Sequence, residues 1–112
     1  MAASKSDDFE PRITTLARLA KALSHPARIA ILETLAKKAT CICGEIVEVL
    51  PLAQSTVSQH LKELKDAGLI KGEINGLKSC YCLNPQTVKE LEKLSGSLLK
   101  VLNKGLNTKK CC

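Results

Sequence analysis

Residues 54–85, QSTVSQHLKELKDAGLIKGEINGLKSCYCLNP, decide the fold because their pattern changes from helical to extended within one short stretch. Apolar residues at spacings of four and three predict an amphipathic helix over 54–67; they are Val57, Leu61 and Leu64. Gly68 stands where a glycine in the left-handed conformation commonly ends a helix. The period then changes over 69–74, and Asn75-Gly76 is the strongest short signal for a β-hairpin turn. We therefore predict a helix followed by a hairpin.

Further elements are predicted on both sides of this stretch. They are helices over 11–23, 26–38 and 41–50, a turn over 51–53, a return strand over 79–83 and a last helix from Pro85. Pro11 and Pro26 fit the first position of their helices, where the missing N–H costs nothing. The order of four helices, a hairpin and a helix is typical of a winged helix-turn-helix, a mostly α fold with a small β-hairpin. In the second helix we expect the core side to consist of Ile29, Leu32 and Leu35.

At 112 residues the chain fits one compact domain. We place this domain over 11–104, between a flexible N-terminal arm, 1–10, and a flexible cysteine-containing tail, 105–112. A chain this short buries a modest fraction of its surface, so a second copy would stabilise it. We predict a homodimer formed by the first and last helices, whose apolar stripes exceed what the small core needs. Those stripes are Leu91, Leu94, Leu98, Val101 and Leu102 against Leu16, Leu19 and Leu23 of the partner.

The charge balance points to a polyanionic partner, since 17 Lys and Arg stand against 11 Asp and Glu, a net charge of +6. No stretch approaches the roughly 20 apolar residues that a membrane span needs. The N-terminus also lacks the apolar core of a secretory signal. We therefore expect a cytoplasmic protein without a membrane partner. In the reducing cytosol six cysteines are not expected to form a disulfide framework, which favours metal binding or thiol chemistry.

The helix over 54–67 has the outward chemistry of a DNA-reading helix. Its exposed positions are small, polar or amide-bearing, and no acidic residue occurs between Gln54 and Lys62. Glutamine can pair with adenine through two hydrogen bonds, while serine and threonine contact bases or phosphates. The predicted contacts on double-stranded DNA are Gln54, Ser55, Thr56, Ser58, Gln59, His60 and Lys62. The bland alternative is a solvated amphipathic helix.

The hairpin is the predicted wing. Lysines flank its turn and could reach a phosphate or the minor groove. Its candidate DNA contacts are Lys71, Asn75, Gly76 and Lys78. A hairpin with lysine on both strands is also an ordinary soluble hairpin, and that alternative stays open.

Three motifs together resemble the ArsR family of metalloregulatory winged-helix repressors. They are SHPARIAIL at 24–32, STVSQHLKELKDAGLI at 55–70, and the Cys-x-Cys at 41–43, within a match over 19–85. The resemblance implies a homodimer that binds an inverted-repeat operator without ligand and releases it when ligand binds. By position, Cys41 and Cys43 match the two leading thiols of the arsenic-type metal box. Residues 55–62 match the recognition helix, and Asn75-Gly76 the wing tip.

Two positions depart from the family pattern. The third cysteine of the arsenic sensors would fall at Ile46. The serine that usually caps the recognition helix corresponds to Ala53, and loss of such a cap costs about 1 kcal/mol unless another group replaces it. His25, next to Pro26, is expected to cap the second helix rather than to bind metal.

The six cysteines fall into three pairs. Cys41 and Cys43 are expected to be soft-metal ligands rather than buried small apolar residues. Cys80 and Cys82 share one face of a strand and serve equally well as weaker metal candidates or as packing under the wing. Cys111 and Cys112 follow two lysines, which favours thiolates, and they are expected to be ligands or reactive thiols.

We therefore expect a site of Cys41, Cys43 and one tail thiol for trivalent arsenic or antimony, with cadmium, lead or zinc as further ligands. Residues two apart on a helix point about 200° from each other. The third helix must then begin after Cys43, or its first turn must unwind when the ion binds.

The leading hypothesis is thus a DNA-binding repressor that releases its operator when arsenite or antimonite is bound. The first alternative keeps the fold and responds to thiol oxidation or persulfide instead. An enzyme such as an arsenate reductase is disfavoured, since there is no Cys-x-x-Cys after a strand, no nucleophile loop and no acid–base pair. We expect that the protein is not an enzyme.

Overall fold

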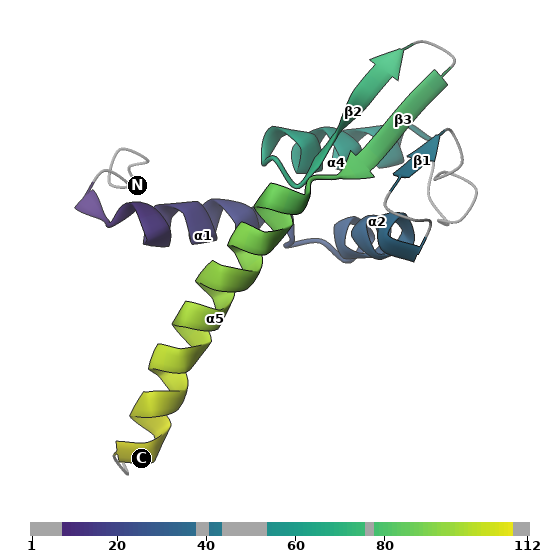
Figure 1. Ribbon diagram of the computed structural model, residues 1–112. Helices are drawn as coiled ribbons and strands as arrows, with labels where there is room; N and C mark the ends of the chain where they lie inside the picture. The colour runs from purple at the N-terminus through teal and green to yellow at the C-terminus, as the bar shows by residue number, and fades with distance from the viewer. Residues whose placement is uncertain (1–7, 38–40, 44–53, 76–77, 109–112) are drawn as a thin grey trace.

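The computed structural model describes residues 8–37, 41–43, 54–75 and 78–108 (Figure 1). Its elements in chain order are α1 (Pro11–Ala22), α2 (Pro26–Lys37), β1 (Cys41–Cys43), α4 (Gln54–Asp66), β2 (Ile70–Asn75), β3 (Lys78–Leu83) and α5 (Pro85–Thr108). The predicted first, second and fourth helices, the hairpin and the final helix are confirmed in this order, and the fold is a winged helix-turn-helix. None of the described helices combines the length and the apolar character that crossing a bilayer requires.

Helix α4 ends at the predicted glycine. Gly68 has a φ of +88°, and its N–H donates to the carbonyl of Lys65 at 2.9 Å. The N–H of Leu69 donates to the carbonyl of Leu64 at 3.1 Å. These two bonds form a Schellman motif, which satisfies the last carbonyls of the helix. The chain therefore turns directly from α4 into the wing.

The sheet has one strand more than the sequence predicted. β3 is central in an antiparallel sheet of order β1-β3-β2, and β2 and β3 form the predicted hairpin. β1 pairs with β3 so that Cys41 lies opposite Cys82 and Cys43 opposite Cys80. The prediction of a helix from Cys41 is wrong at 41–43, because pairing with β3 gives these peptide groups their partners instead. The remainder of that prediction, 44–50, and the turn over 51–53 lie outside the described residues.

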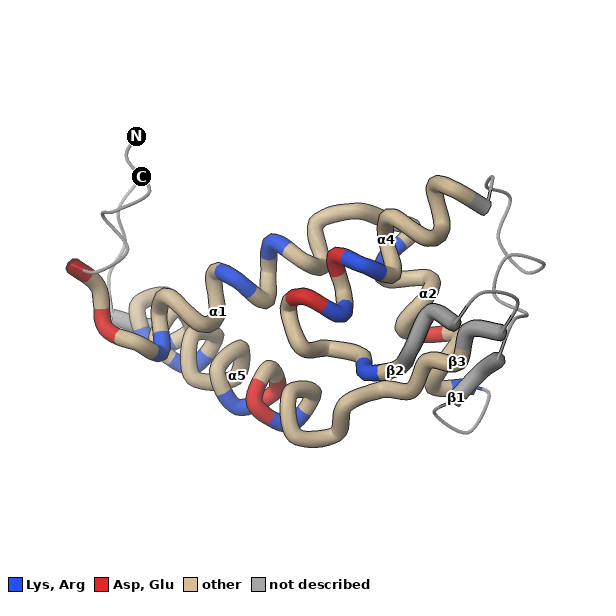
Figure 2. The backbone as a smooth tube through the Cα atoms, turned by 90° about the horizontal axis from the view of Figure 1, so that it is seen from above, with Lys and Arg blue, Asp and Glu red and all other residues tan. Residues whose placement is uncertain are grey.

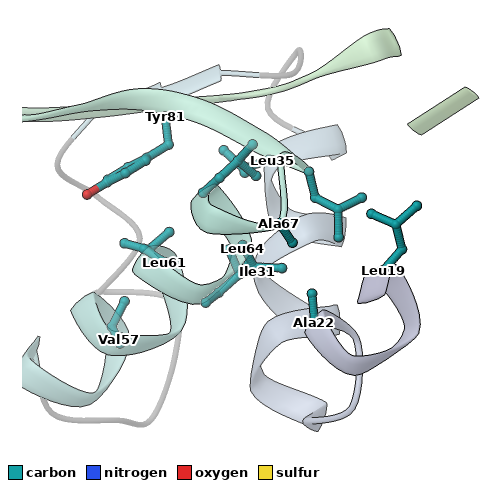
Figure 3. Packing of buried hydrophobic residues seen from close by; sticks show 11 residues of the cluster. Leu19, Ala22, Ile31, Leu35, Val57, Leu61, Leu64, Ala67 and Tyr81 are labelled. Atoms are coloured by element: carbon teal, nitrogen blue, oxygen red, sulfur yellow. The ribbon is translucent and has the colours of Figure 1, made fainter. Parts of the chain in front are cut away.

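The core is aliphatic and lies where α1, α2, α4 and the sheet meet (Figure 3). Its fully buried side chains come from all these elements: Leu19, Ile31, Leu35, Val57, Leu64, Leu69 and Ile70. The inward positions predicted for α4 are confirmed, since Val57, Leu61 and Leu64 are at most 4% exposed. Tyr81 of β3 is also buried here. The residues on either side of it in β3 therefore belong to the opposite face of the sheet.

The inward face of α2 differs from the prediction at one position. Ile29 is 45% exposed, whereas Ile31 is fully buried. Leu35 is buried as predicted, and Leu32 packs at the edge of the core. Residues 29–32 are all apolar, so helical periodicity cannot choose between them. Contact with α4 and β3 makes that choice.

Helix α5 extends away from the rest of the molecule after crossing α1 (Figure 1). It continues to Thr108, beyond the boundary expected at 104, so the segment predicted as a flexible tail from 105 begins as helix. Together with α1 it lines an apolar groove with a volume of about 430 Å³, formed mainly by Ile13, Leu16, Leu94, Leu98 and Val101. Leu19 lies in the core with no exposed surface. The prediction that Leu19 contacts a partner copy is therefore wrong.

Candidate nucleic-acid interface and cysteine site

The outward face of α4 is polar and exposed. Ser55, Thr56, Ser58 and Gln59 are all exposed. The first half of the helix carries no acidic or basic residue and is tan in Figure 2, while charges begin at Lys62. The side chain of Gln54 lies outside the described residues. This face offers short hydroxyl and amide groups to a partner, the chemistry that contacts base edges and phosphates.

Weak contacts occupy the longer side chains of this face. The Gln59 amide donates to a Glu63 carboxylate oxygen at 3.4 Å. The Lys62 ammonium lies 3.5 Å from Asp66, and both side chains are more than 60% exposed. An exposed pair of this kind contributes at most about 1 kcal/mol. Gln59 and Lys62 can therefore exchange these partners for a nucleic acid at little cost in free energy.

His60 does not belong to the outward face. It is only 7% exposed, and its Nδ1 accepts a hydrogen bond from Nε of Arg28 at 3.1 Å. Its ring centroid lies 4.4 Å from that of His25. Burial, with His25 and Arg28 as further causes, lowers the pKa of His60 below its ordinary value, against an opposing effect of Glu63. The prediction that His60 contacts DNA is corrected: it packs inward, as a neutral acceptor.

Arg28 holds three helices together at this point, a role that its place in SHPARIAIL did not indicate. Besides His60, its guanidinium donates to the carbonyls of Lys21 and Ala22 at the end of α1. His25 accepts the N–H of Ala27 at 3.0 Å through Nδ1, which confirms its predicted role as the cap of α2. The arrangement fixes how α4 sits against α1 and α2.

Asn84 performs a similar function at the base of the wing. Its N–H donates to the carbonyl of Leu69 and its side-chain amide to the carbonyl of Gly68, both at 3.0 Å. Its Oδ1 accepts the N–H of Gln86 at 3.2 Å and so caps α5. The end of β3 is thereby bonded to the end of α4 and to the start of α5. Movement of the wing strand must act on both helices.

The predicted wing contacts are described in part. Lys71 is exposed on β2. Asn75 and Lys78 are partners at the end of the hairpin, with only their backbones described, and Gly76 lies outside the described residues. β2 is held close to β3 at Gly72, where φ is +154° and a Cβ would collide with the backbone of Cys80. The hairpin therefore depends on a glycine that the sequence analysis did not single out.

Four cysteines meet in the sheet. Cys41 and Cys43 face Cys82 and Cys80 in the β1–β3 register, with only the backbone of β1 described. Cys80 is exposed and Cys82 half-buried, on the face opposite the buried Tyr81. Both are disulfide-bonded, contrary to the expectation of thiols without a disulfide framework. That expectation considered only the compartment, whereas register brings the cysteines together.

The remaining predicted ligands are not described. Cys111 and Cys112 lie outside the described residues, as do Ile46 and Ala53. Among the side chains that are described, no three His, Cys, Asp or Glu residues gather in a way that could hold a metal ion.

Comparison with known proteins identifies the family. A model of a helix-turn-helix domain matches residues 23–73. The chain is 37% identical over 83 residues to the uncharacterised HTH-type transcriptional regulator MJ1325 of Methanocaldococcus jannaschii, covering 73% of this chain and 92% of that protein. It is 40% identical over 72 residues to the arsenical resistance operon repressor of Bacillus subtilis, covering 63% and 68%.

A solved structure shows the same fold. The homodimeric winged helix-turn-helix DNA-binding domain Mb0332 of Mycobacterium bovis, a possible ArsR-family transcriptional regulator, aligns with a TM-score of 0.59 and 22% identity over 100% of this chain and 96% of that one. The exposed polar face of α4, the wing and these relatives agree on one class of protein. The chain belongs to the ArsR family of winged helix-turn-helix transcriptional repressors, which are DNA-binding regulators and not enzymes.

Proposed function

We propose that this repressor acts in the cytoplasm as a homodimer that binds duplex DNA through α4 and the wing. It releases the DNA when cysteine thiolates bind trivalent arsenic or antimony. The DNA-binding half rests on the outward face of α4, whose exposed residues are Ser55, Thr56, Ser58, Gln59 and Lys62. A dimer reads two half-sites about one helical turn, ~34 Å, apart.

The groove between α1 and α5 supports the dimer. On and beyond the groove, α5 exposes Leu99, Val101, Leu102 and Leu106 by 54% or more. A contiguous apolar surface of this kind usually marks an interface, and the related fold of Mb0332 is homodimeric. Leu98→Asp would bury a charge there and should give a monomer with weaker DNA binding. An intact dimer of this variant in sedimentation would contradict this interface.

The β1–β3 register is the observation that carries the ligand response. In an extended strand residues two apart share one face, so Cys41 and Cys43 need no helix unwinding to bind one ion. Their register partners are Cys82 and Cys80. Soft thiolates suit soft ions, and arsenite requires reduced thiols, so the disulfides of the sheet must open first.

The third thiolate has two sources. Cys80 or Cys82 can supply it within the sheet, and Cys111 or Cys112 can supply it from the tail. We favour the sheet because its register already aligns two cysteines with Cys41 and Cys43. An ion that links β1 to β3 would shift β3. Asn84 directly follows this strand, and its hydrogen bonds connect it to Gly68 and to the start of α5. Displacement of β3 would therefore change the angle between α4 and the dimer helix.

The test is a DNA-release titration under anaerobic reductant. The protein first selects its own duplex from a random-sequence pool, and anisotropy of that labelled duplex is then followed with arsenite and, separately, with cadmium. Wild type should release the duplex, and Cys41→Ser/Cys43→Ser should bind it with unchanged affinity but not release it. Release by that double variant at wild-type arsenite concentrations would exclude the proposed site.

Two further double variants decide the third ligand. If the sheet supplies it, Cys80→Ser/Cys82→Ser should weaken the arsenite response while Cys111→Ser/Cys112→Ser leaves it unchanged. The reverse result would assign the third thiolate to the tail. A redox sensor would instead lose all response in reductant.

A further inference from the structure

We propose that the four strand cysteines are a modification site in which two cross-strand disulfides form, Cys41–Cys82 and Cys43–Cys80. In this oxidised state the site is closed to arsenite. The pairing stands on the sheet alone, whereas the effect on arsenite rests on the proposed function. The starting observation is that Cys80 and Cys82 are both disulfide-bonded while lying opposite Cys43 and Cys41.

The geometry of an antiparallel pair selects these partners. Directly opposed residues have Cα atoms about 4.5 Å or about 5.5 Å apart, depending on whether they exchange hydrogen bonds. Both values lie within the range of roughly 4.4–6.8 Å that disulfides require. Residues two apart in one strand are separated by about 6.7 Å, at the upper limit of that range, and diagonal residues by about 7–8 Å, whereas the commonest disulfide separation is about 5.5–6 Å. Bonds within Cys80-Tyr81-Cys82, or between Cys43 and Cys82, are therefore disfavoured.

The outer face of the sheet makes Cys80 accessible and Cys82 partly so. Tyr81 faces the core, so its neighbours Cys80 and Cys82 lie on the outer face, where Cys80 is exposed. Lys71 of β2 lies opposite Cys82 in the register and is itself exposed. A neighbouring ammonium group stabilises a thiolate, the form that attacks a disulfide. Cys82 is therefore the expected first nucleophile.

The oxidant is a low-molecular-weight disulfide. The Cys82 thiolate attacks it, releasing one small thiolate and leaving a mixed disulfide on Cys82. The thiolate of Cys41 then attacks the Cys82 sulfur, which forms the cross-strand bond and releases the second small thiolate. Two electrons pass to the oxidant for each pair, and the two protons of the protein thiols end on the two released thiols. Cys43 and Cys80 react in the same way.

Formation of the disulfides closes the ligand site. Arsenite binds thiolates, and a sulfur held in a disulfide is not available to it. Oxidation and arsenite therefore compete for the same sulfurs. A repressor with both pairs closed stays on its operator when arsenite is present, and reduction restores the response.

The pairing is tested on the full chain in a Cys111→Ser/Cys112→Ser background, so that the tail does not interfere. The reduced protein is equilibrated with graded ratios of oxidised to reduced glutathione, free thiols are alkylated, and tryptic peptides are mapped without reduction. Residues 39–62 and 79–89 should be linked to each other. A disulfide confined to either peptide would overturn the proposal.

Matched variants decide which cysteines pair. Cys43→Ser/Cys80→Ser leaves the opposed Cys41 and Cys82, whereas Cys41→Ser/Cys80→Ser leaves the diagonal Cys43 and Cys82. The opposed pair should close at a glutathione disulfide ratio at least about tenfold lower than the diagonal pair. Circular dichroism confirms that both variants are folded. Equal closure of the two variants would overturn the assigned register of the bonds.

The arsenite effect is read separately, as arsenic retained per protomer after desalting. Reduced protein should retain arsenic, oxidised protein should not, and a reducing agent should restore binding. Equal retention by oxidised and reduced protein would overturn the closure. If the reduced protein retains none, the proposed arsenite response fails, while the peptide map still decides the disulfide pairing.

Discussion

Helix α4 and strand β1 both lie in stretches for which the sequence predicts a helix, over 54–67 and 41–50, yet of the two only α4 is helical. Its 13 residues carry a repeating apolar pattern and a glycine stop. The three residues of β1 are too few to show a periodicity. Their conformation is set by pairing with β3, some 40 positions further along the chain. A conformation that is set by neighbouring residues can be predicted from the sequence pattern. A conformation that is set by pairing with a distant segment, as in β1, cannot.

The largest effect is expected where α4 enters the core. Leu64 is fully buried among α1, α2 and the sheet, so Leu64→Ala leaves a cavity and should lower the free energy of unfolding by about 2–5 kcal/mol. Ser58→Ala, on the exposed side of the same helix, is the matched control and should change it by less than about 0.5 kcal/mol. Urea unfolding at one protein concentration measures both. Similar losses for the two variants would mean that the two faces of α4 are not as distinct as described.

A smaller loss is expected in the sheet. At Gly72 a Cβ would collide with the backbone of Cys80, and the φ of +154° disfavours any other residue. Gly72→Ala should therefore cost about 1–3 kcal/mol and loosen the pairing of the hairpin. Gly96, in α5, has open space around its Cα, so Gly96→Ala should instead stabilise by about 0.4–1 kcal/mol. A shift of the unfolding temperature in the same direction for both variants would contradict the role given to Gly72.

These differences show how far the sequence alone reaches. The bounds of α1, α2, α4 and α5 and the hairpin could be predicted within a few residues, because each has its own periodicity, proline or glycine signal. The burial of His60 could not, since its position on α4 is polar and its contacts with Arg28 of α2 and with His25, which caps α2, explain it. The gathering of four cysteines required the β1–β3 register. Pairs that close over long sequence separations are therefore what the structure adds to the site.

Substitutions on the outer face of α4 should change the DNA specificity and leave the stability of the fold unchanged. Gln59→Ala removes an amide suited to adenine and should reduce discrimination at one base position per half-site by about 1–3 kcal/mol. Lys62→Ala should weaken all sequences alike and reduce the salt slope by about 0.9 for each phosphate that is no longer neutralised. Affinities for selected and scrambled duplexes over a range of salt concentrations measure both effects. If Gln59→Ala weakens both duplexes equally, Gln59 does not read a base.

The smallest expected effect is a pH dependence of the free energy of unfolding. It arises from His60 on α4 and not from the cysteines of β1 and β3. The pKa of His60 is lowered from 6.5, first by burial and then by His25 and Arg28. Below pH 6.5 the unfolded chain then binds more protons at this residue than the folded protein does, so the free energy of unfolding falls as the pH falls. Above pH 6.5 the contribution of His60 to the free energy of unfolding is fully present.

One histidine can contribute a slope of at most about 1.4 kcal/mol per pH unit. His60→Gln keeps an acceptor for the Arg28 bond of 3.1 Å but cannot be protonated. Its free energy of unfolding should therefore fall less than that of wild type between about pH 7 and about pH 5. Urea unfolding of both proteins across that range measures the difference, and reduced and oxidised samples should show the same difference because the sheet cysteines take no part. Parallel pH profiles for wild type and His60→Gln would show that burial of His60 does not exclude the proton.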